Sequence, residues 1–359
     1  MQALRIYAGP KAMALLRQRG GLSPEQVAAV PAAAGGPKGL MLLHLDAFLF
    51  GEWLPQAKRP VQLVGASIGA WRMATACLQE PAAAFQRLAH DYIHQDFQPP
   101  PGQKRPSAAQ VSEAFAQSLQ LFYGGREHEV LSHPHWRLHV VVSQGQAGLR
   151  REHRWHTPAG YAAAWLANAV DRRYLGRWLQ RGVFSVAPEQ GLPMWPDHMP
   201  THQWGLDASN FMSAVRASCS IPFAMQAVHD IPGAPSGAYW DGGITDYHLH
   251  WSFKTAADEV VLYPHFQRHI VPGWLDKVWR HRHPATAALD NMVVLAPNEE
   301  WVKGLPNGKL PDRHDFTHYA NDFAGRVEAW SRAVSASERL LQEWQEWLMR
   351  PDLQQVQPL

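Results

Sequence analysis

The chain has 359 residues, of which 46% are hydrophobic and 18% charged, values typical of globular and not of disordered proteins. Its formal net charge of +2 gives no sign of a nucleic-acid-binding field. The two cysteines, Cys77 and Cys219, are too few for a disulfide framework and favour a reducing compartment. The N-terminal residues do not show the basic region followed by an apolar region of a signal peptide, and no uncharged apolar run reaches transmembrane length. We therefore expect a cytoplasmic protein, at most peripheral to a membrane.

Predicted strands and helices alternate along the first third of the chain. An N-terminal extension, residues 1–26, carries a short amphipathic helix at about 10–19. Strand 27–34, helix 40–54, strand 61–64 and helix 68–79 follow, and further strands are expected at 138–143, 183–186, 260–263 and 292–295. Helices are also expected at 161–180 and 209–219, and residues 187–207 are expected to form a loop. This alternation predicts an α/β fold with mostly parallel strands.

Two helical regions stand outside this pattern. Residues 81–135 are predicted as a helical insertion over one face of the sheet, with a Pro-rich loop at 99–102. Residues 301–359 form a C-terminal helical extension, whose long helix at about 322–349 has apolar side chains at spacings of three and four. This face is expected to pack on the core or to form a homo-oligomer contact. Contact with lipid is the alternative, which the mixed Glu and Arg of the opposite face disfavour.

The clearest chemical motif is Gly-Ala-Ser-Ile-Gly at residues 65–69, between a predicted strand and a helix. This is the pattern of a nucleophile elbow, in which a serine stands on a strained turn at the N-terminus of a helix. Gly65 and Gly69 lack Cβ atoms, so that strand and helix can approach closely. Ser67 is therefore the predicted nucleophile, and an ordinary tight turn is the alternative.

A second motif, Gly-Gly-Pro-Lys-Gly at residues 35–39, follows the neighbouring predicted strand. If the two strands are adjacent and parallel, this turn and the elbow share one edge of the sheet. The N–H groups of Gly35 and Gly36 are then candidate oxyanion donors, whereas Pro37 has no N–H. The third motif is Asp-Gly-Gly, formed by Asp241, Gly242 and Gly243.

These three motifs, in this order, resemble those of the patatin-like phospholipase family. The stretch 214–222, Ala-Val-Arg-Ala-Ser-Cys-Ser-Ile-Pro, is similar to the helix that precedes the Asp motif in that family. The resemblance covers about residues 27–250 and identifies the chain as a divergent, bacterial-type member. It implies a patatin-like catalytic domain at 27–300, with a three-layer α/β/α architecture.

The resemblance also implies a chemistry. Ser67 would attack an ester carbonyl, and Asp241 would act directly as the general base, without a histidine. Gly35 and Gly36 would hold the oxyanion, with the amides of Lys38 and Gly39 completing the loop. The expected activity is acyl-ester hydrolysis of a phospholipid, lysophospholipid or neutral lipid through an acyl-enzyme, with no cofactor and no metal.

Two departures from the family pattern bear on the site. Ala34 replaces the first glycine of the family's loop, and residues 244–248, Ile-Thr-Asp-Tyr-His, replace the Asn-x-Pro that often follows the Asp motif. These leave the loop geometry, the substrate type and the roles of Asp246, Tyr247 and His248 open.

Three alternatives remain at this stage. A Ser-His-Asp hydrolase would add a later histidine, such as His248, His265 or His318. A metal site would use the histidine clusters 128–139 or 281–283, which lack the helical spacing of zinc peptidases. A non-catalytic lipid- or partner-binding module would use the aromatic surface that 16 tryptophans could supply.

Overall fold

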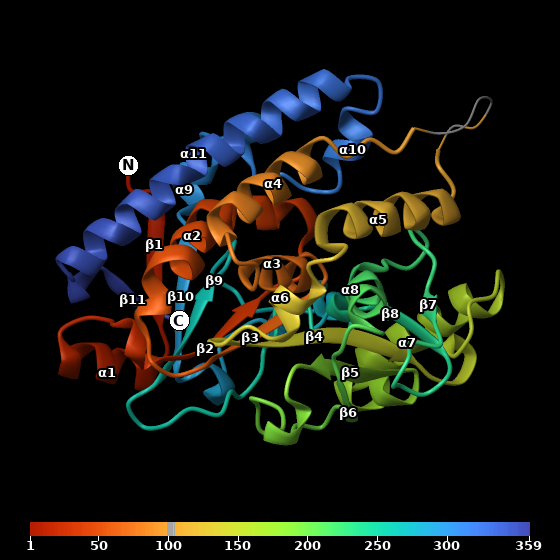
Figure 1. Ribbon diagram of the computed structural model, residues 1–359, viewed down its shortest axis with the longest axis horizontal. Helices are drawn as coiled ribbons and strands as arrows, with labels where there is room; N and C mark the ends of the chain where they lie inside the picture. The colour runs from red at the N-terminus through yellow and green to blue at the C-terminus, as the bar shows by residue number, and fades with distance from the viewer. Residues whose placement is uncertain (99–102, 104) are drawn as a thin grey trace.

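A mostly parallel sheet of 11 strands forms the centre of the computed structural model, which describes residues 1–98, 103 and 105–359 (Figure 1). Nine strands follow the order β11-β1-β10-β9-β2-β3-β4-β5-β6, and β8 pairs with β4 and β7. The strands are β1 (Leu4–Ala8), β2 (Val27–Ala32), β3 (Val61–Ala66), β4 (Trp136–Gly145), β5 (Leu179–Ser185), β6 (Thr201–Gly205), β7 (Val228–His229), β8 (Ala238–Asp241), β9 (Val260–Pro264), β10 (Met292–Pro297) and β11 (Val356–Pro358).

Helices flank this sheet. They are α1 (Pro10–Arg19), α2 (Leu43–Phe48), α3 (Ile68–Ala76), α4 (Pro81–Ile93), α5 (Ala108–Tyr123), α6 (Glu127–Leu131), α7 (His156–Val170), α8 (Phe211–Cys219), α9 (Glu299–Val302), α10 (Asp315–His318) and α11 (Phe323–Met349). The predicted α/β class with mostly parallel strands is confirmed. Residues 81–135 carry α4, α5 and α6, while the Pro-rich loop at 99–102 lies outside the described residues.

The pairing on which the site depends is present. β2 and β3 are parallel neighbours, with Ala32 opposite Gly65, so the two motif-bearing turns leave the same edge of the sheet. Each strand is buried and apolar because helices or packed segments cover both of its faces.

Some predicted elements were wrong or missing. β1, β6, β7 and β11 were not predicted, and β6 lies within residues 187–207, which were expected to be loop-like. β1 and β11 place the two chain ends side by side in the sheet. The helix expected at 161–180 instead spans His156–Val170. Pro158 is accepted in its first turn, where a missing N–H removes no helical hydrogen bond, and β5 has already begun at Leu179. The helix expected at 40–54 is divided into 3-10, α and π segments.

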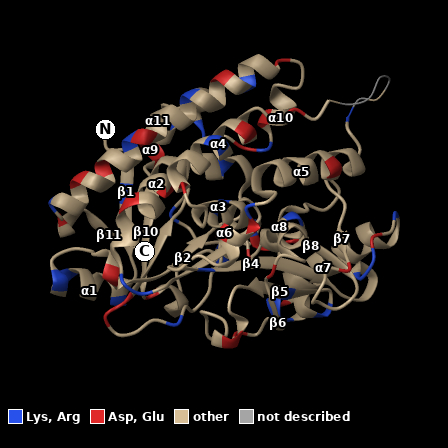
Figure 2. Ribbon diagram, in the orientation of Figure 1, with Lys and Arg blue, Asp and Glu red and all other residues tan. Residues whose placement is uncertain are grey.

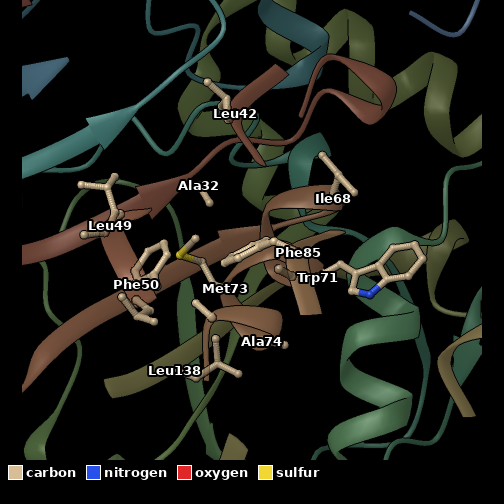
Figure 3. Close-up of a cluster of buried hydrophobic side chains, with 14 of the residues drawn as sticks. Ala32, Leu42, Leu49, Phe50, Ile68, Trp71, Met73, Ala74, Phe85 and Leu138 are labelled. Atoms are coloured by element: carbon tan, nitrogen blue, oxygen red, sulfur yellow. The ribbon is translucent and has the colours of Figure 1, made fainter. Parts of the chain in front are cut away.

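The largest hydrophobic core lies between the sheet and helices α2, α3, α4, α5, α8 and α11. Alternate residues of β3 face it, and Figure 3 shows side chains such as Phe50, Met73, Phe85 and Leu138 meeting there. A second cluster covers the opposite face of the sheet, where Val64 and Ala66 pack with Tyr247 and Trp251. The face predicted on the long C-terminal helix packs on the first core, with Trp344 edge-on to Trp53 at 6.2 Å between ring centroids.

Helix α11 is the longest helix of the described chain, and it crosses the top of the molecule in Figure 1. Neither it nor any other helix in the described ranges combines the length and apolar character needed to span a bilayer.

Candidate active site

Ser67 lies between β3 and α3 with φ 57° and ψ −129°, a conformation that non-glycine residues rarely adopt. The surrounding glycines make this turn possible. A Cβ on Gly69 would lie 1.9 Å from the Ala32 carbonyl oxygen, and one on Gly65 would lie 2.5 Å from the Ala70 backbone. Strand and helix therefore approach as closely as the elbow motif predicts. The packing of the surrounding structure keeps the Ser67 backbone in its strained conformation.

Asp241, the last residue of β8, contacts the serine directly. The Ser67 hydroxyl donates a hydrogen bond to Asp241 Oδ2 at 2.6 Å, and both side chains are buried. The Gly243 N–H donates to Asp241 Oδ1 at 2.7 Å and fixes the orientation of the carboxylate. A Cβ on Gly243 would lie 2.5 Å from Ala34 Cβ, so the second glycine of the motif lets the Asp turn pack against the Gly-rich loop.

Ser218 of α8 fixes the backbone of the elbow. The Ser67 N–H donates to Ser218 Oγ at 2.9 Å, and the Ser218 hydroxyl donates to the Val141 carbonyl at 2.6 Å. This amide is thus already used and is not free for a substrate oxygen. Sequence reasoning named Ser218 only as part of the helix resemblance.

The Gly-rich turn forms the start of the 3-10 helix η2 (Gly36–Leu42) beside the elbow. Gly36 has φ 58° and lines the same cavity as Ser67. Within the described chain, the Gly35 and Gly36 N–H groups have no hydrogen-bond acceptor, which leaves them free to bind an oxyanion. A Cβ on Gly35 would lie 2.6 Å from the Phe266 ring, so a side chain at this position would have to displace that ring.

Lys38 and Gly39 sit further along η2. Lys38 Nζ lies 5.2 Å from the Phe266 ring centroid, and a Cβ on Gly39 would lie 3.0 Å from Ile68 Cγ1. These contacts show Gly39 packing η2 against α3. None of them directs the Lys38 or Gly39 amide at the serine, so the first two glycines are the better-supported donors.

Burial raises the pKa of Asp241, because a carboxylate is poorly solvated there, while Arg313, the Ser67 hydroxyl, the Gly243 N–H and Lys277 act in the opposite direction. A carboxyl held this way is a stronger base than a free aspartate once it is ionised. A purely structural role for Asp241, as an ordinary turn residue, does not explain why its carboxylate contacts the hydroxyl of Ser67, whose backbone is strained.

Two basic side chains, Arg313 and Lys277, lie near enough to Asp241 to favour its carboxylate. Arg313 borders the cavities on both sides of the dyad, and a Cβ on Gly36 would lie 3.2 Å from Arg313 Nε. Lys277 Nζ lies 4.0 Å over the Tyr247 ring. Among the described residues, Lys38, Lys277 and Arg313 form no ion pair with a carboxylate within 4.0 Å. Arg313 and Lys277 were missed from sequence, because no motif surrounds either of them.

Two apolar cavities of the described chain meet at the dyad. The first, of about 300 Å³, reaches Ser67 and is lined by α3, α4 and α5 side chains including Trp71, Tyr92 and Phe115. The second, of about 320 Å³, reaches Asp241 and is lined by Tyr161, Trp165, Phe223, Tyr247 and Trp274. Ile221 and Arg313 border both cavities.

Comparison with protein-family models and with curated proteins finds no match. The resemblance to patatin-like phospholipases therefore depends on the three motifs and their order in the sequence.

The candidate histidines of a Ser-His-Asp triad lie elsewhere. His248 Nδ1 accepts a hydrogen bond from the Val271 N–H at 3.0 Å, and His265 Nδ1 is paired with Gln267. His318 lies against the Tyr319 ring. In the part of the chain that the structure describes, no histidine is hydrogen-bonded to Ser67 or Asp241.

The predicted histidine clusters have structural contacts. His133 stacks on Trp136 at 5.2 Å, and His139 is buried between Ser185 and Gln62. No group of three His, Cys, Asp or Glu side chains in the described ranges is arranged to hold a metal ion.

The residues after the Asp-Gly-Gly motif have separate roles. Asp246 is buried and accepts hydrogen bonds from the Arg181 guanidinium at 2.6 Å and the Trp251 indole at 2.7 Å. Tyr247 borders the second cavity, and its ring stacks on His248 with 4.2 Å between centroids. Asp246 thus anchors the turn, while Tyr247 contributes a wall of the site.

Cys219 also borders the first cavity and is the other potential nucleophile there. Burial, followed by the nearby Asp241 carboxylate, raises the pKa of its thiol well above the usual value. A thiol that stays protonated is a poor nucleophile. Ser67 is the better-placed group.

Proposed function

We propose that this protein is a serine hydrolase of patatin type that cleaves lipid acyl esters with Ser67 as nucleophile and Asp241 as general base. The observation that carries the proposal is the 2.6 Å hydrogen bond from the hydroxyl of Ser67, whose backbone is strained, to Asp241. The order of the motifs, the free N–H groups at Gly35 and Gly36, and the apolar cavities support it.

In the acylation step, Asp241 accepts the Ser67 proton as Oγ attacks the ester carbonyl. The carbonyl oxygen becomes an oxyanion, which the Gly35 and Gly36 N–H groups bind. When the carbon–oxygen bond to the alcohol breaks, protonated Asp241 donates its proton to the leaving oxygen. Water then attacks the acyl-enzyme, giving its proton to Asp241, which returns it to Ser67 as the carboxylic acid leaves.

This proton movement assigns the two cavities. The acyl group stays on Ser67, so its chain occupies the first cavity, which Ser67 and Gly36 line. The leaving alcohol must receive a proton from Asp241, so it occupies the second cavity. The buried Tyr161 hydroxyl there has no partner among the described residues and can bind a polar group of that alcohol.

The apolar linings favour a lipid ester over a small polar ester, and Arg313, which borders both cavities, favours an anionic group near the scissile bond. An acyl glycerol phosphate combines these features. Phospholipids and lysophospholipids are therefore the first substrates to examine, and neutral lipid esters are the comparison.

The test is a lipid-ester panel run on the wild type, Ser67→Ala and Asp241→Asn. We expect each variant to lose at least about 10³-fold in kcat with at least one substrate that the wild type cleaves, because both residues act in the same step. Ser209→Ala, at an exposed serine, and Asp230→Asn, at an exposed aspartate, are the matched controls. Equal activity in wild type and both dyad variants would refute the proposal.

A further inference from the structure

The outward face of α7 is apolar. The 15 residues of this helix include no Asp, Glu, Lys or Arg, which Figure 2 shows as an uninterrupted tan ribbon. From the capping residue onward, exposed residues recur at spacings of three and four and form one stripe. The stripe comprises Trp155, Pro158, Ala159, Ala162, Trp165, Leu166 and Val170, and the exposed His156 at the start of the helix lies outside it.

The opposite face of α7 is fixed to the protein. Tyr161, Ala164 and Asn168 are buried, and the Asn168 amide donates a hydrogen bond to Asp276 at 2.9 Å. The apolar stripe thus points outward while the helix is anchored. A surface helix ordinarily turns its polar face to solvent, so the reversed arrangement indicates an interaction surface.

This stripe continues into an aromatic rim around the second cavity. Trp165 lines that cavity and stacks on Trp279 with 5.9 Å between ring centroids. Phe223 and Trp274 line it as well and are 64% and 46% exposed, and the neighbouring Val278 is 65% exposed. The surface therefore surrounds the opening through which the proposed alcohol group would enter.

Basic side chains flank this apolar surface at both ends. Arg150, Arg151 and Arg154 are exposed before α7, and Arg177 and Lys277 are exposed beyond it. The acidic groups nearby are Glu152, which accepts from the Ala227 N–H, Asp171, which is paired with Arg173, and Asp276, which is paired with Arg172 and Arg282. Positive charge exceeds negative charge around the stripe.

We propose that the α7 stripe and its aromatic rim dock on an anionic lipid surface, with the second cavity opening toward the lipid. The proposal rests on the proposed function for its biological use, because docking would bring the site to a lipid ester. An apolar helical face with tryptophans, bordered by arginines, matches the apolar boundary and anionic headgroups of a membrane surface. A protein partner or a second copy of the chain would have to supply an acidic surface to match these basic side chains, whereas anionic lipid headgroups supply that charge directly.

The test is cosedimentation with vesicles of phosphatidylcholine alone and of phosphatidylcholine with phosphatidylglycerol. The proteins are the wild type, Ser67→Ala, Leu166→Glu with Val170→Glu, and Arg151→Gln with Arg154→Gln. Leu166 and Val170 are 60% and 78% exposed and are not lining residues of the cavity, so these substitutions leave the core intact. Met349→Glu, at a residue 74% exposed on the far end of α11, and Arg17→Gln with Arg19→Gln on α1 are the matched controls.

We expect the wild type and Ser67→Ala to bind the anionic vesicles equally and more tightly than the neutral ones. The Leu166 and Val170 pair and the arginine pair should each weaken binding by about tenfold, and raised salt should weaken it further, whereas the controls stay within about twofold of the wild type. Thermal unfolding of each variant verifies that it is folded.

Three results would overturn the inference: wild-type binding to neither vesicle, equal binding by the Leu166 and Val170 pair, or a solution dimer that this pair dissociates, which would make a second copy the occupant. Because Ser67→Ala binds without turnover, these results are separate from the ester panel. Vesicle binding with no hydrolysis by the wild type would remove the proposed function and leave the docking surface standing.

Discussion

The two cavities that meet at the dyad have similar volumes and different walls. The Ser67 side is lined by helices α3, α4 and α5, several of whose side chains belong to the main core. The Asp241 side is bounded by α7, a 3-10 turn at Trp274–Asp276 and exposed aromatic residues. We infer that the first cavity is shaped to select an acyl chain, while the second admits groups from a surface. Fold stability and specificity should therefore respond differently to changes on the two sides.

Buried ion pairs beneath the cavities give the largest expected contrast. Asp46 binds Arg72 of α3 at 2.6 Å, and both side chains are fully buried. Asp276 binds Arg172 and Arg282, which are 14% and 17% exposed. Asp46→Ala should lower the free energy of unfolding by about 3–5 kcal/mol, because Arg72 is left charged and buried. Asp276→Ala should cost less, since its arginines can reach water. Urea unfolding measures the free energy of unfolding of both variants. An equal loss in the two, or a larger loss in Asp276→Ala, would contradict the expected difference.

Filling each cavity separately should change specificity in opposite ways. Ala224 borders the first cavity and Ala162 the second, and both are exposed enough to accept a larger side chain. Ala224→Trp should lower kcat/KM for long acyl chains by about 10- to 100-fold and spare short ones. Ala162→Trp should act on the alcohol group, discriminating against large alcohols at constant acyl length. The measurement is kcat/KM for a set of esters that vary in acyl length and in alcohol size. Identical selectivity in both variants would contradict the assignment of the acyl chain to the first cavity and the alcohol to the second.

The cations at the junction should set the acidic limb of the pH profile. Asp241 must be ionised to act as a base, and Arg313 favours its carboxylate more than Lys277 does. Arg313→Gln should raise the Asp241 pKa and move the acidic limb of kcat/KM toward higher pH by about one pH unit. Lys277→Met should move it in the same direction by less. A shift toward lower pH in either variant would exclude Asp241 as the titrating base.

Lys277 should give the smallest effect, on stability. Burial of its ammonium, followed by the charges of Arg313 and Lys38, lowers its pKa to about 7, although part of the side chain is exposed. Because the folded state disfavours the charged ammonium, the resulting loss of folding stability is fully present below pH 7. This loss decreases as the pH rises from about 7 toward the usual pKa of a lysine. Lys277→Met should stabilise the fold at pH 6 by less than about 1 kcal/mol and by less again at pH 9. Thermal unfolding at both values tests this sign.

The sequence was informative where backbone geometry dictates residue type. Ser67 needs glycines on both sides because a Cβ at either one would overlap the backbone, and this requirement leaves a readable motif. The parallel neighbours β2 and β3 followed from strand–helix alternation. The Ser67–Asp241 contact joins residues 174 positions apart, and only the order of the motifs pointed to it.

Other features depend on tertiary packing and leave no local signal. Arg313 reaches the site from an irregular segment between β10 and α10, and nothing in its neighbours marks it. The short strands β6 and β11 are defined by the strands they pair with. The direction of the α7 stripe could not be predicted, since a helix without charged residues is ordinarily assigned to the interior.

The most direct test of the central claim is mass spectrometry of the intact chain after reaction with a fluorophosphonate. We expect one adduct per chain, located on Ser67 by peptide mapping, absent in Ser67→Ala and formed at least about 10²-fold more slowly in Asp241→Asn, which lacks the base. The thermal unfolding midpoint of each variant verifies that it is folded. Labelling at another residue, or an Asp241→Asn variant that reacts as fast as the wild type, would contradict the Ser67–Asp241 dyad.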